Sequence, residues 1–431
     1  MGRLITTAIP NSRITLDQSL ELRTNRTFLW YLLSTFLAGM GWMIQWVAIT
    51  WMMVEIDGRP EMVGLVQTCL SLPVIFFAMP AGALSDLFGR KAVVVPAQML
   101  IVLVVLLLVY LIIDQSLNVP WLLALAFVLG GARASVSPAW QSYVSHIVPK
   151  PVLRKAVSLN SVGFNLARTL GPALGGLTLS VLGPALTLVL SGLLSSFLLG
   201  VGRRLPRRRG RRVRPTQIWR SILASVVYAW NDHVLRDAYV TASLFNFSGI
   251  VIISLMPFLA ASLLEAGSTG YGLLMGVFGA GAIFGAFVQT KFSLQVDLGV
   301  YIKRLFRVFA LFLLVMFLVD SVVTTVVGIF VSGSCWLMLH SSLSALIQTH
   351  SKERYRSRCQ ALFQFMIFGG NGIGALVWGV VAGSFTVTAA FGVSALTIFV
   401  GSFYVFYSTN RARRSPSSAQ ISSALENGSP E

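Results

Sequence analysis

Twelve long apolar segments govern what this chain can fold into. A helix needs about 20 mostly apolar residues to span a bilayer, and each of these segments has roughly that length. They cover residues 28–52, 61–84, 92–112, 120–140, 156–178, 183–202, 240–263, 270–290, 304–320, 324–347, 359–383 and 386–408. Only 11% of the 431 residues are charged, too few to cover a soluble protein of this size. Because the runs are continuous rather than short and alternating, the sequence predicts an all-α polytopic membrane protein and not a barrel.

Lys and Arg residues set the expected orientation of these helices. Of the 33 Lys and Arg residues, all but Arg59, Arg133 and Arg168 lie in the two terminal segments or in alternate segments between the predicted spans. Positive residues accumulate on the cytoplasmic side of a membrane. The sequence therefore predicts a multi-pass protein of a bacterial inner membrane or plasma membrane, with both termini cytoplasmic. The net charge of +18 fits contact between these loops and anionic membrane lipids, and no nucleic-acid partner is expected.

The twelve spans divide into two sets of six. Between the sets lies "GRRLPRRRGRRVRP", which is too charged to enter a membrane. Short echoes, such as "GALSD" at Gly82 and "GAFVQ" at Gly285, recur at an offset of about 200 residues, which indicates a duplicated unit. We expect two pseudo-symmetric six-helix bundles. The expected parts are a cytoplasmic N-terminal segment (1–27), an N-terminal bundle (28–202), a basic cytoplasmic linker (203–239), a C-terminal bundle (240–408) and a disordered cytoplasmic tail (409–431).

Several function classes find no support in the residues. The sequence has no GxxxxGK[ST] motif, so ATP hydrolysis by this chain is not expected. Its three cysteines, Cys69, Cys335 and Cys359, are too scattered for a metal site or a disulfide framework. We expect no enzyme activity, no cofactor and no metal, and a monomeric protein.

The first motif with chemical content is "GALSDLFGRKA" (82–92). It resembles the loop signature between helices 2 and 3 of the major facilitator superfamily. The matching residues are Gly82, Leu84, Asp86, Gly89, Arg90 and Lys91. The resemblance implies a conformational latch in which Asp86 pairs with a basic residue or a helix N-terminus of the other bundle. The alternative is that Asp86 only caps a helix; the second half has Gln289 at the corresponding place.

A second motif, "GFNLARTLGPALGG" (163–176), resembles the glycine-proline motif on helix 5 of exporter branches of this superfamily. Gly171, Pro172, Gly175 and Gly176 carry it. Small residues allow close helix contact and Pro172 bends the span, although general small-residue packing would explain the same residues. Most of residues 28–200 is similar to the branch containing the enterobactin exporter and the transmembrane secretion effectors. That resemblance implies proton-driven antiport and efflux of small molecules, with siderophore export and multidrug resistance as known roles.

Polar residues within the spans are the candidates for a substrate cavity, which in such folds lies at mid-membrane between the halves. On helix 1, Trp42, Gln45 and Trp46 share one face. The full candidate set is Trp42, Gln45, Trp46, Arg133, Asn165, Arg168, Asn246, His340, Gln364 and Asn371. Each also has a structural interpretation, as packing for the tryptophans and His340 and as helix-to-helix hydrogen bonding for the amides.

The carboxylates do not reveal how transport would be coupled to protons. None of the 15 acidic residues lies in the middle of a predicted span. The coupling candidates are Glu55 near the outer mouth, Asp86 in the latch and His340. Arg133 and Arg168, without a buried acid beside them, would suit an anionic substrate.

Three functions remain open on this evidence. The first is proton-coupled export of a siderophore or an amphipathic drug by alternating access. The second is uptake or facilitated transport of a small anion or lipid by the same fold. The third, a receptor or scaffold that transports nothing, is less well supported because the loops are short.

Overall fold

The computed structural model describes residues 25–141, 143–203, 215–263, 267–292, 297–352 and 355–413. All regular structure within these ranges is helical. The elements are α2 (Arg26–Ile56), α3 (Pro60–Ser71), α4 (Pro73–Phe88), α5 (Arg90–Ile113), α6 (Val119–Gln141), α7 (Val144–Ile147), the 3-10 turn η1 (Lys150–Val152), α8 (Leu153–Arg203), α9 (Pro215–Asn231), α10 (His233–Leu263), α11 (Gly267–Phe292), α12 (Leu298–Leu318), α13 (Val322–His350), α14 (Arg356–Ser384) and α15 (Val387–Arg413). The predicted N-terminal segment and tail lie almost wholly outside the described residues.

Among the described residues, ten helices are long and apolar enough to cross a membrane. This number counts α8 once, although α8 contains two of the predicted spans. It leaves out α12, in which Lys303, Arg304 and Arg307 raise the local charge. The prediction of an all-α polytopic membrane protein is confirmed, and the twelfth crossing remains a prediction that rests on α12.

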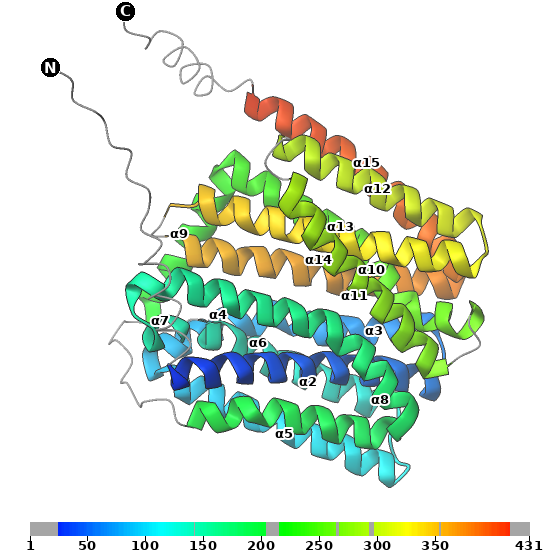
Figure 1. Cartoon of the computed structure of the whole chain (residues 1–431), viewed down its shortest axis with the longest axis horizontal. Helices are drawn as coiled ribbons and strands as arrows, with labels where there is room; N and C mark the ends of the chain where they lie inside the picture. Colours follow the sequence, from blue (N-terminus) through cyan, green and yellow to red (C-terminus); the bar gives the residue numbers. More distant parts are fainter. Residues whose placement is uncertain are drawn as a thin grey trace, which may run out of the picture.

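The long α8 reverses direction at Gly183 (Figure 1). Gly183 has φ 74° and ψ 174°, a conformation that a residue with a Cβ rarely adopts. Pro184 follows immediately, and its fixed φ suits the first turn of a new helix. The two predicted spans 156–178 and 183–202 are therefore the two arms of α8.

One predicted span, residues 61–84, is divided into α3 and α4. The division falls at Leu72, because Pro73 has no N–H to donate into the preceding turn. The Leu72 N–H still bonds the Thr68 carbonyl oxygen at 2.7 Å, so the chain continues in nearly the same direction. The result is a single crossing with a break near its middle.

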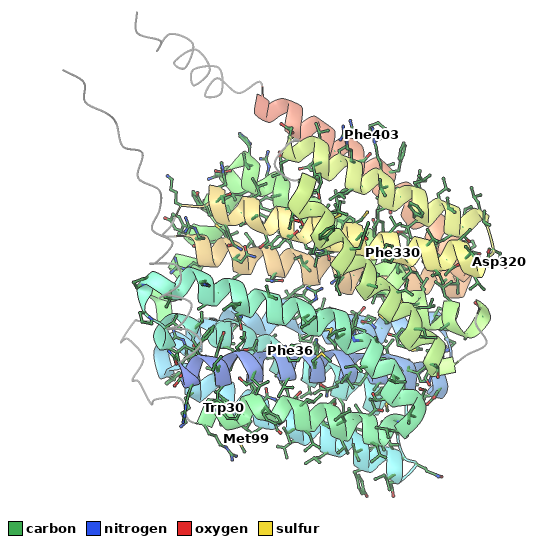
Figure 2. The ribbon with its side chains drawn as sticks, viewed as in Figure 1. Trp30, Phe36, Met99, Asp320, Phe330 and Phe403 are labelled. Carbon is green, nitrogen blue, oxygen red and sulfur yellow. The ribbon has the colours of Figure 1, made fainter. Side chains whose placement is uncertain are left out.

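The helices form two groups, α2–α8 and α10–α15, joined mainly by contacts of α3 with α14 and of α8 with α11 (Figure 1). The start of α2 and the end of α15 lie at the same end of the helices, which we call the terminal end; the opposite end is the far end (Figure 1). Asp320 lies at the far end, while Met99 and Phe403 lie on opposite outer flanks (Figure 2). The side chains of Met99 and Phe403 are 42% and 51% exposed, as expected of residues that face lipid.

The described part of the predicted linker is mostly helical. Residues 215–231 form α9 and α10 already begins at His233, seven residues before the predicted start of the span. Residues 204–214 lie outside the described part. The limits of the two bundles remain a prediction.

Candidate functional site

The two halves meet at a far-end seam formed by α3 and α14 on one side and by α8 and α11 on the other. On the first side, Gly64 faces Ala375, and Gly379 faces the backbone of Pro60 and Glu61. On the second side, Gly176 faces Gly272. Glycine and alanine at these positions let the backbones come close, which is a common way for membrane helices to associate.

The seam reaches to about the middle of the helices. Thr68 of α3 donates its hydroxyl to the Gly372 carbonyl oxygen at 2.7 Å, and Ile75 lies 3.5 Å from the position a Cβ would take on Gly369. Among the described residues, these close approaches of α3 and α4 to α14 run from Pro60 to Ile75. The halves are therefore sealed to each other from the far end inwards.

Arg168 lies in the middle of the first arm of α8. More than a third of the surface of Arg168 is accessible, although neighbouring protein atoms surround its guanidinium. The side chain therefore faces an accessible space inside the protein. Its guanidinium carbon is 6.0 Å from the ring centre of Phe164, one turn earlier on the same helix.

His340 lies on α13 in the second half, and polar and aromatic groups surround its ring. Its Nδ1 is 2.7 Å from the Trp336 carbonyl oxygen, and its Nε2 is 3.1 Å from Oδ1 of Asn246 on α10. The ring stacks on Trp336, with centres 5.1 Å apart, and meets the edge of Phe245 at 6.1 Å. Two sequence candidates, Asn246 and His340, are therefore joined directly.

A second cation lies within the first half. The guanidinium carbon of Arg133 on α6 is 5.6 Å from the ring centre of Trp42 on α2, a distance typical of a cation–π contact. Neither Arg133 nor Arg168 is in an ion pair with a carboxylate among the described residues. Both positive charges therefore lack an acidic partner in the part of the chain that the structure describes.

Trp46 belongs to a hydrogen-bond network that sequence reasoning missed. Its indole Nε1 donates to Oε1 of Gln67 at 2.6 Å, and Nε2 of Gln67 donates to the Thr50 hydroxyl at 2.8 Å. The hydroxyl of Tyr271 from the second half lies beside Thr50, although its geometry falls short of a strict hydrogen bond. Gln67 could have been found as a polar residue within a span; Tyr271 gave no signal in the sequence.

No hydrogen bond within the described part of the chain joins the remaining amide candidates to one another. Gln364 and Asn371 both lie on α14; Gln364 is exposed, and Oδ1 of Asn371 is buried without a hydrogen-bond partner among the described residues. Gln45 is buried, and its Nε2 also has no partner there. The side chain of Asn165 lies outside the described residues.

Comparison with known sequences identifies the family. The sequence model of the transmembrane secretion effectors matches residues 21–427. The chain belongs to this family. It is 24% identical over 371 residues to the multidrug efflux pump Tap of Mycobacterium tuberculosis (strain ATCC 25618 / H37Rv), which covers 81% of this chain and 85% of Tap. It is 22% identical to the staphyloferrin A transporter of Staphylococcus aureus (strain NCTC 8325 / PS 47), over 60% of this chain and 65% of that protein.

Solved structures give the same fold. A peptide transporter of the POT family has a TM-score of 0.72 at 12% identity, over 92% of this chain and 98% of that one. A bacterial homologue of the lysosomal transporter Spinster has a TM-score of 0.66 at 13% identity, over 89% and 96%. This transmembrane secretion effector is therefore a multi-pass transporter of the major facilitator superfamily and not an enzyme, as the sequence predicted.

Within this transmembrane secretion effector, the glycine-proline motif has two packing roles. Gly171 and Gly175 lie against α2 of the same half, where their Cβ atoms would meet Met43 and Ile44. Gly176 instead lies in the far-end seam against Gly272. The motif thus combines packing within one half with contact between the halves.

The latch motif is only partly described. Gly89, with φ 87°, separates α4 from α5 and allows the sharp turn between them. Lys91 bonds the Arg203 carbonyl oxygen at the end of α8, and so ties α5 to α8 within the first half. The side chain of Asp86 lies outside the described part of the structure, and Gly82 is described only as part of α4. A contact of Asp86 with the other half remains a prediction.

At the far end, Oε1 of Glu55 accepts a hydrogen bond from the indole of Trp51 at 2.7 Å. Asp57, just beyond α2, accepts from Arg59 at 2.7 Å, and this bond holds the Asp57 pKa below its ordinary value. A further carboxyl, Glu61, was not among the sequence candidates. Its Oε2 is buried in the seam with no hydrogen-bond partner among the described residues.

Proposed function

We propose that this transporter exports a small molecule, a siderophore or an amphipathic drug, by alternating access driven by protons. The observation that carries the proposal is Arg168, a cation in the middle of the first arm of α8 that keeps solvent-accessible surface. A charged group at this depth is costly unless it serves a substrate or a water-filled path, so it marks a transport site. The family relatives named for drug efflux and for staphyloferrin A agree with such cargo.

The side on which the two halves are sealed also agrees with export. With both termini in the cytoplasm, the far-end seam would close the outer side, and the site would be reached from the cytoplasm. That is the state in which an exporter takes up its cargo. The basic segments at the terminal end would contact anionic lipids of the inner leaflet, and a monomer contains the complete site.

Transport by inside-out vesicles tests the proposal. We expect vesicles with the purified protein to accumulate a fluorescent amphipathic dye or a hydroxycarboxylate siderophore when protons are more concentrated inside, and to stop when a protonophore is added. Trp30→Phe, which alters an exposed side chain away from the seam, is a matched control and should transport normally. Cargo movement that is unaffected by the protonophore would contradict proton-driven export.

The second candidate function is uptake or facilitated transport of a small anion. It is favoured by Arg133 and Arg168, two cations without a carboxylate partner among the described residues. The same vesicles distinguish the two functions. Equilibration of an anion without accumulation, at equal rates in both orientations, would support facilitated transport.

A further inference from the structure

The exposed face of α12 carries two arginines within a predicted membrane span. Figure 1 shows α12 beside α15 on the outer flank of the second half, and α12 packs mainly on α15 and α13. Its buried face is apolar and includes Leu305, Phe306 and Phe309. Its opposite face is exposed at intervals of three or four residues, at Val300, Arg304, Arg307, Leu311, Leu314 and Leu318. Arg304 and Arg307 therefore share a face with leucines that meet lipid tails.

Their position along the helix places these arginines inside the apolar layer. Asp320 lies just past α12 at the far end (Figure 2), where a charged residue marks the boundary with water. The twelve residues 308–319 between Arg307 and Asp320 are uncharged and span about 18 Å as a helix. Because the hydrocarbon layer is about 30 Å thick, Arg307 lies about 10 Å inside its boundary at the terminal end. Arg304 is almost one turn nearer to that boundary.

The helices around α12 offer no carboxylate to these arginines. The sequences of α12, α13 and α15 contain no Asp or Glu. Asp297 caps the start of α12 by accepting hydrogen bonds from two backbone N–H groups, and Asp237 of α10 pairs with Arg236. No ion pair within the described part of the chain includes Arg304 or Arg307. Their counter-charge must therefore come from outside the protein.

The chemistry of the two side chains indicates which anion this is. A guanidinium in the apolar layer is costly, and the cost falls when the side chain extends towards the headgroups or the bilayer thins around it. Residues three apart on a helix are neighbours, so the two positive charges repel each other unless an anion lies between them. The planar fork of an arginine matches the oxygen atoms of a phosphate. On the lipid side of α12, the phosphate within reach is that of a phospholipid headgroup.

We propose that Arg304 and Arg307 bind the phosphate of an anionic phospholipid in the leaflet at the terminal end. The acyl chains of this lipid lie along Leu311 and Leu314 on the same face. A headgroup with a net negative charge is favoured, because the ammonium group of a zwitterionic headgroup would add a third positive charge beside the arginines.

This site differs from the lipid contacts of the cytoplasmic loops, because it lies within a span. It neutralises the charge that makes α12 less apolar than the other spans, and so lets α12 form the twelfth crossing. The inference requires that α12 crosses the membrane, but it does not depend on the cargo or on the direction of transport.

A fluorophore on Leu311→Cys tests the site, in the full chain without its native cysteines. Leu311 lies one turn past Arg307 and is 54% exposed. In vesicles, quenching by phosphatidylglycerol with brominated acyl chains is compared with quenching by phosphatidylcholine with the same chains. The ratio gives the relative affinity of the two lipids at this position. We expect phosphatidylglycerol to bind at least about tenfold more tightly there, and both lipids to bind about equally at Leu103→Cys, which is exposed on α5.

Variants assign this selectivity to the two arginines. Arg304→Gln combined with Arg307→Gln should reduce it at least about fivefold, since one Arg near anionic lipid contributes about that factor. Arg307→Lys should retain most of it, because an ammonium group also binds phosphate. Arg26→Gln combined with Arg203→Gln is the matched control. It removes two exposed arginines at the terminal end of α2 and α8 and should leave the selectivity unchanged.

Salt distinguishes the site from contacts of the loops. At about 1 M salt the Debye length is about 3 Å, so exposed charges are screened while charges within the bilayer are screened less. The selectivity at Leu311→Cys should therefore persist. Equal quenching by the two lipids at this position, loss of the selectivity in high salt, or unchanged selectivity in the correctly folded double glutamine variant would each overturn the lipid site. Absence of export with an intact selectivity would overturn the proposed function and support the site.

Discussion

Gly176 of α8 and Gly272 of α11 lie backbone against backbone across the seam between the two halves. A Cβ on Gly176 would fall 2.7 Å from the Gly272 nitrogen, and a Cβ on Gly272 would fall 2.9 Å from the Gly176 carbonyl carbon. Both contacts are with backbone atoms, which cannot turn aside as a side chain can. Closing the far end therefore requires that neither residue carries a side chain.

Gly176→Ala should prevent full closure of the far end. We expect transport to fall at least about tenfold, with normal insertion, because overpacking typically costs 1–3 kcal/mol at a site that must form in each cycle. Gly200→Ala is the control, since nothing lies within 4 Å of its Cβ position. Alkylation of Tyr271→Cys, in a background without native cysteines, should be faster with Gly176→Ala. Equal alkylation and transport in both glycine variants would contradict this role.

The sequence predicted the helices well but not the partners in the seam. Apolar length and loop charge determine where a span lies, so the predicted spans agree with α5 and α6 to within a few residues. The contact of Gly176 with Gly272 joins residues far apart in the chain, and no periodicity within one helix reveals it. Arg168 and His340 were found because a polar residue in a span is conspicuous. The contact of His340 with Asn246 on another helix required the fold.

Glu61 shows that the position of a carboxylate along the sequence does not reveal its burial. It is near the start of a predicted span, so it was not among the coupling candidates. The structure instead places its side chain against Gly383 of α14, with Oε2 buried and no hydrogen-bond partner among the described residues. Only the packing of α3 on α14 shows that this carboxyl is part of the seam.

Glu61→Gln should stabilise the sealed state. The change keeps the shape of the side chain and removes a charge that is partly withdrawn from water at its Oε2 end, a position that is costly without a partner. We expect the unfolding temperature in detergent to rise by a few degrees and the far end to open less often. Asp114→Asn, at an exposed helix end, should change neither.

If the unfolding temperature of Glu61→Gln falls instead, the carboxylate stabilises the seam. The attraction of Arg59, whose charge interacts with that of Glu61, would then exceed the cost of burial. Because Arg59 also pairs with Asp57, a double-mutant cycle of Arg59→Gln with Glu61→Gln distinguishes the two cases: a stabilising coupling between the two residues is expected only in the second.

The bond between Trp46 and Gln67 should be measurable by a double-mutant cycle. Trp46→Phe removes the donor, and Gln67→Leu removes both its bonds, to Trp46 and to the Thr50 hydroxyl. We expect each single change to lower the free energy of unfolding by about 1–3 kcal/mol, because each leaves a buried polar group unpaired. The coupling free energy between them should be about 1 kcal/mol. Strict additivity would show that the two side chains do not interact in the membrane.

Asp86→Asn is the change that separates the two interpretations of the latch. Asn caps a helix N-terminus about as well as Asp does, so a residue that only caps would tolerate the change. A latch to a basic group needs the charge of the carboxylate, and a charge-assisted hydrogen bond is worth about 1.5–3 kcal/mol. We therefore expect initial transport rates to fall about tenfold or more, in reconstituted vesicles with matched amounts of protein. The turn at Gly89 should form as before, so the variant should insert and unfold like the unaltered protein.

Transport rates equal to those of the unaltered protein would show that Asp86 acts only as a helix cap. The connection between the halves at the terminal end would then have to come from other residues.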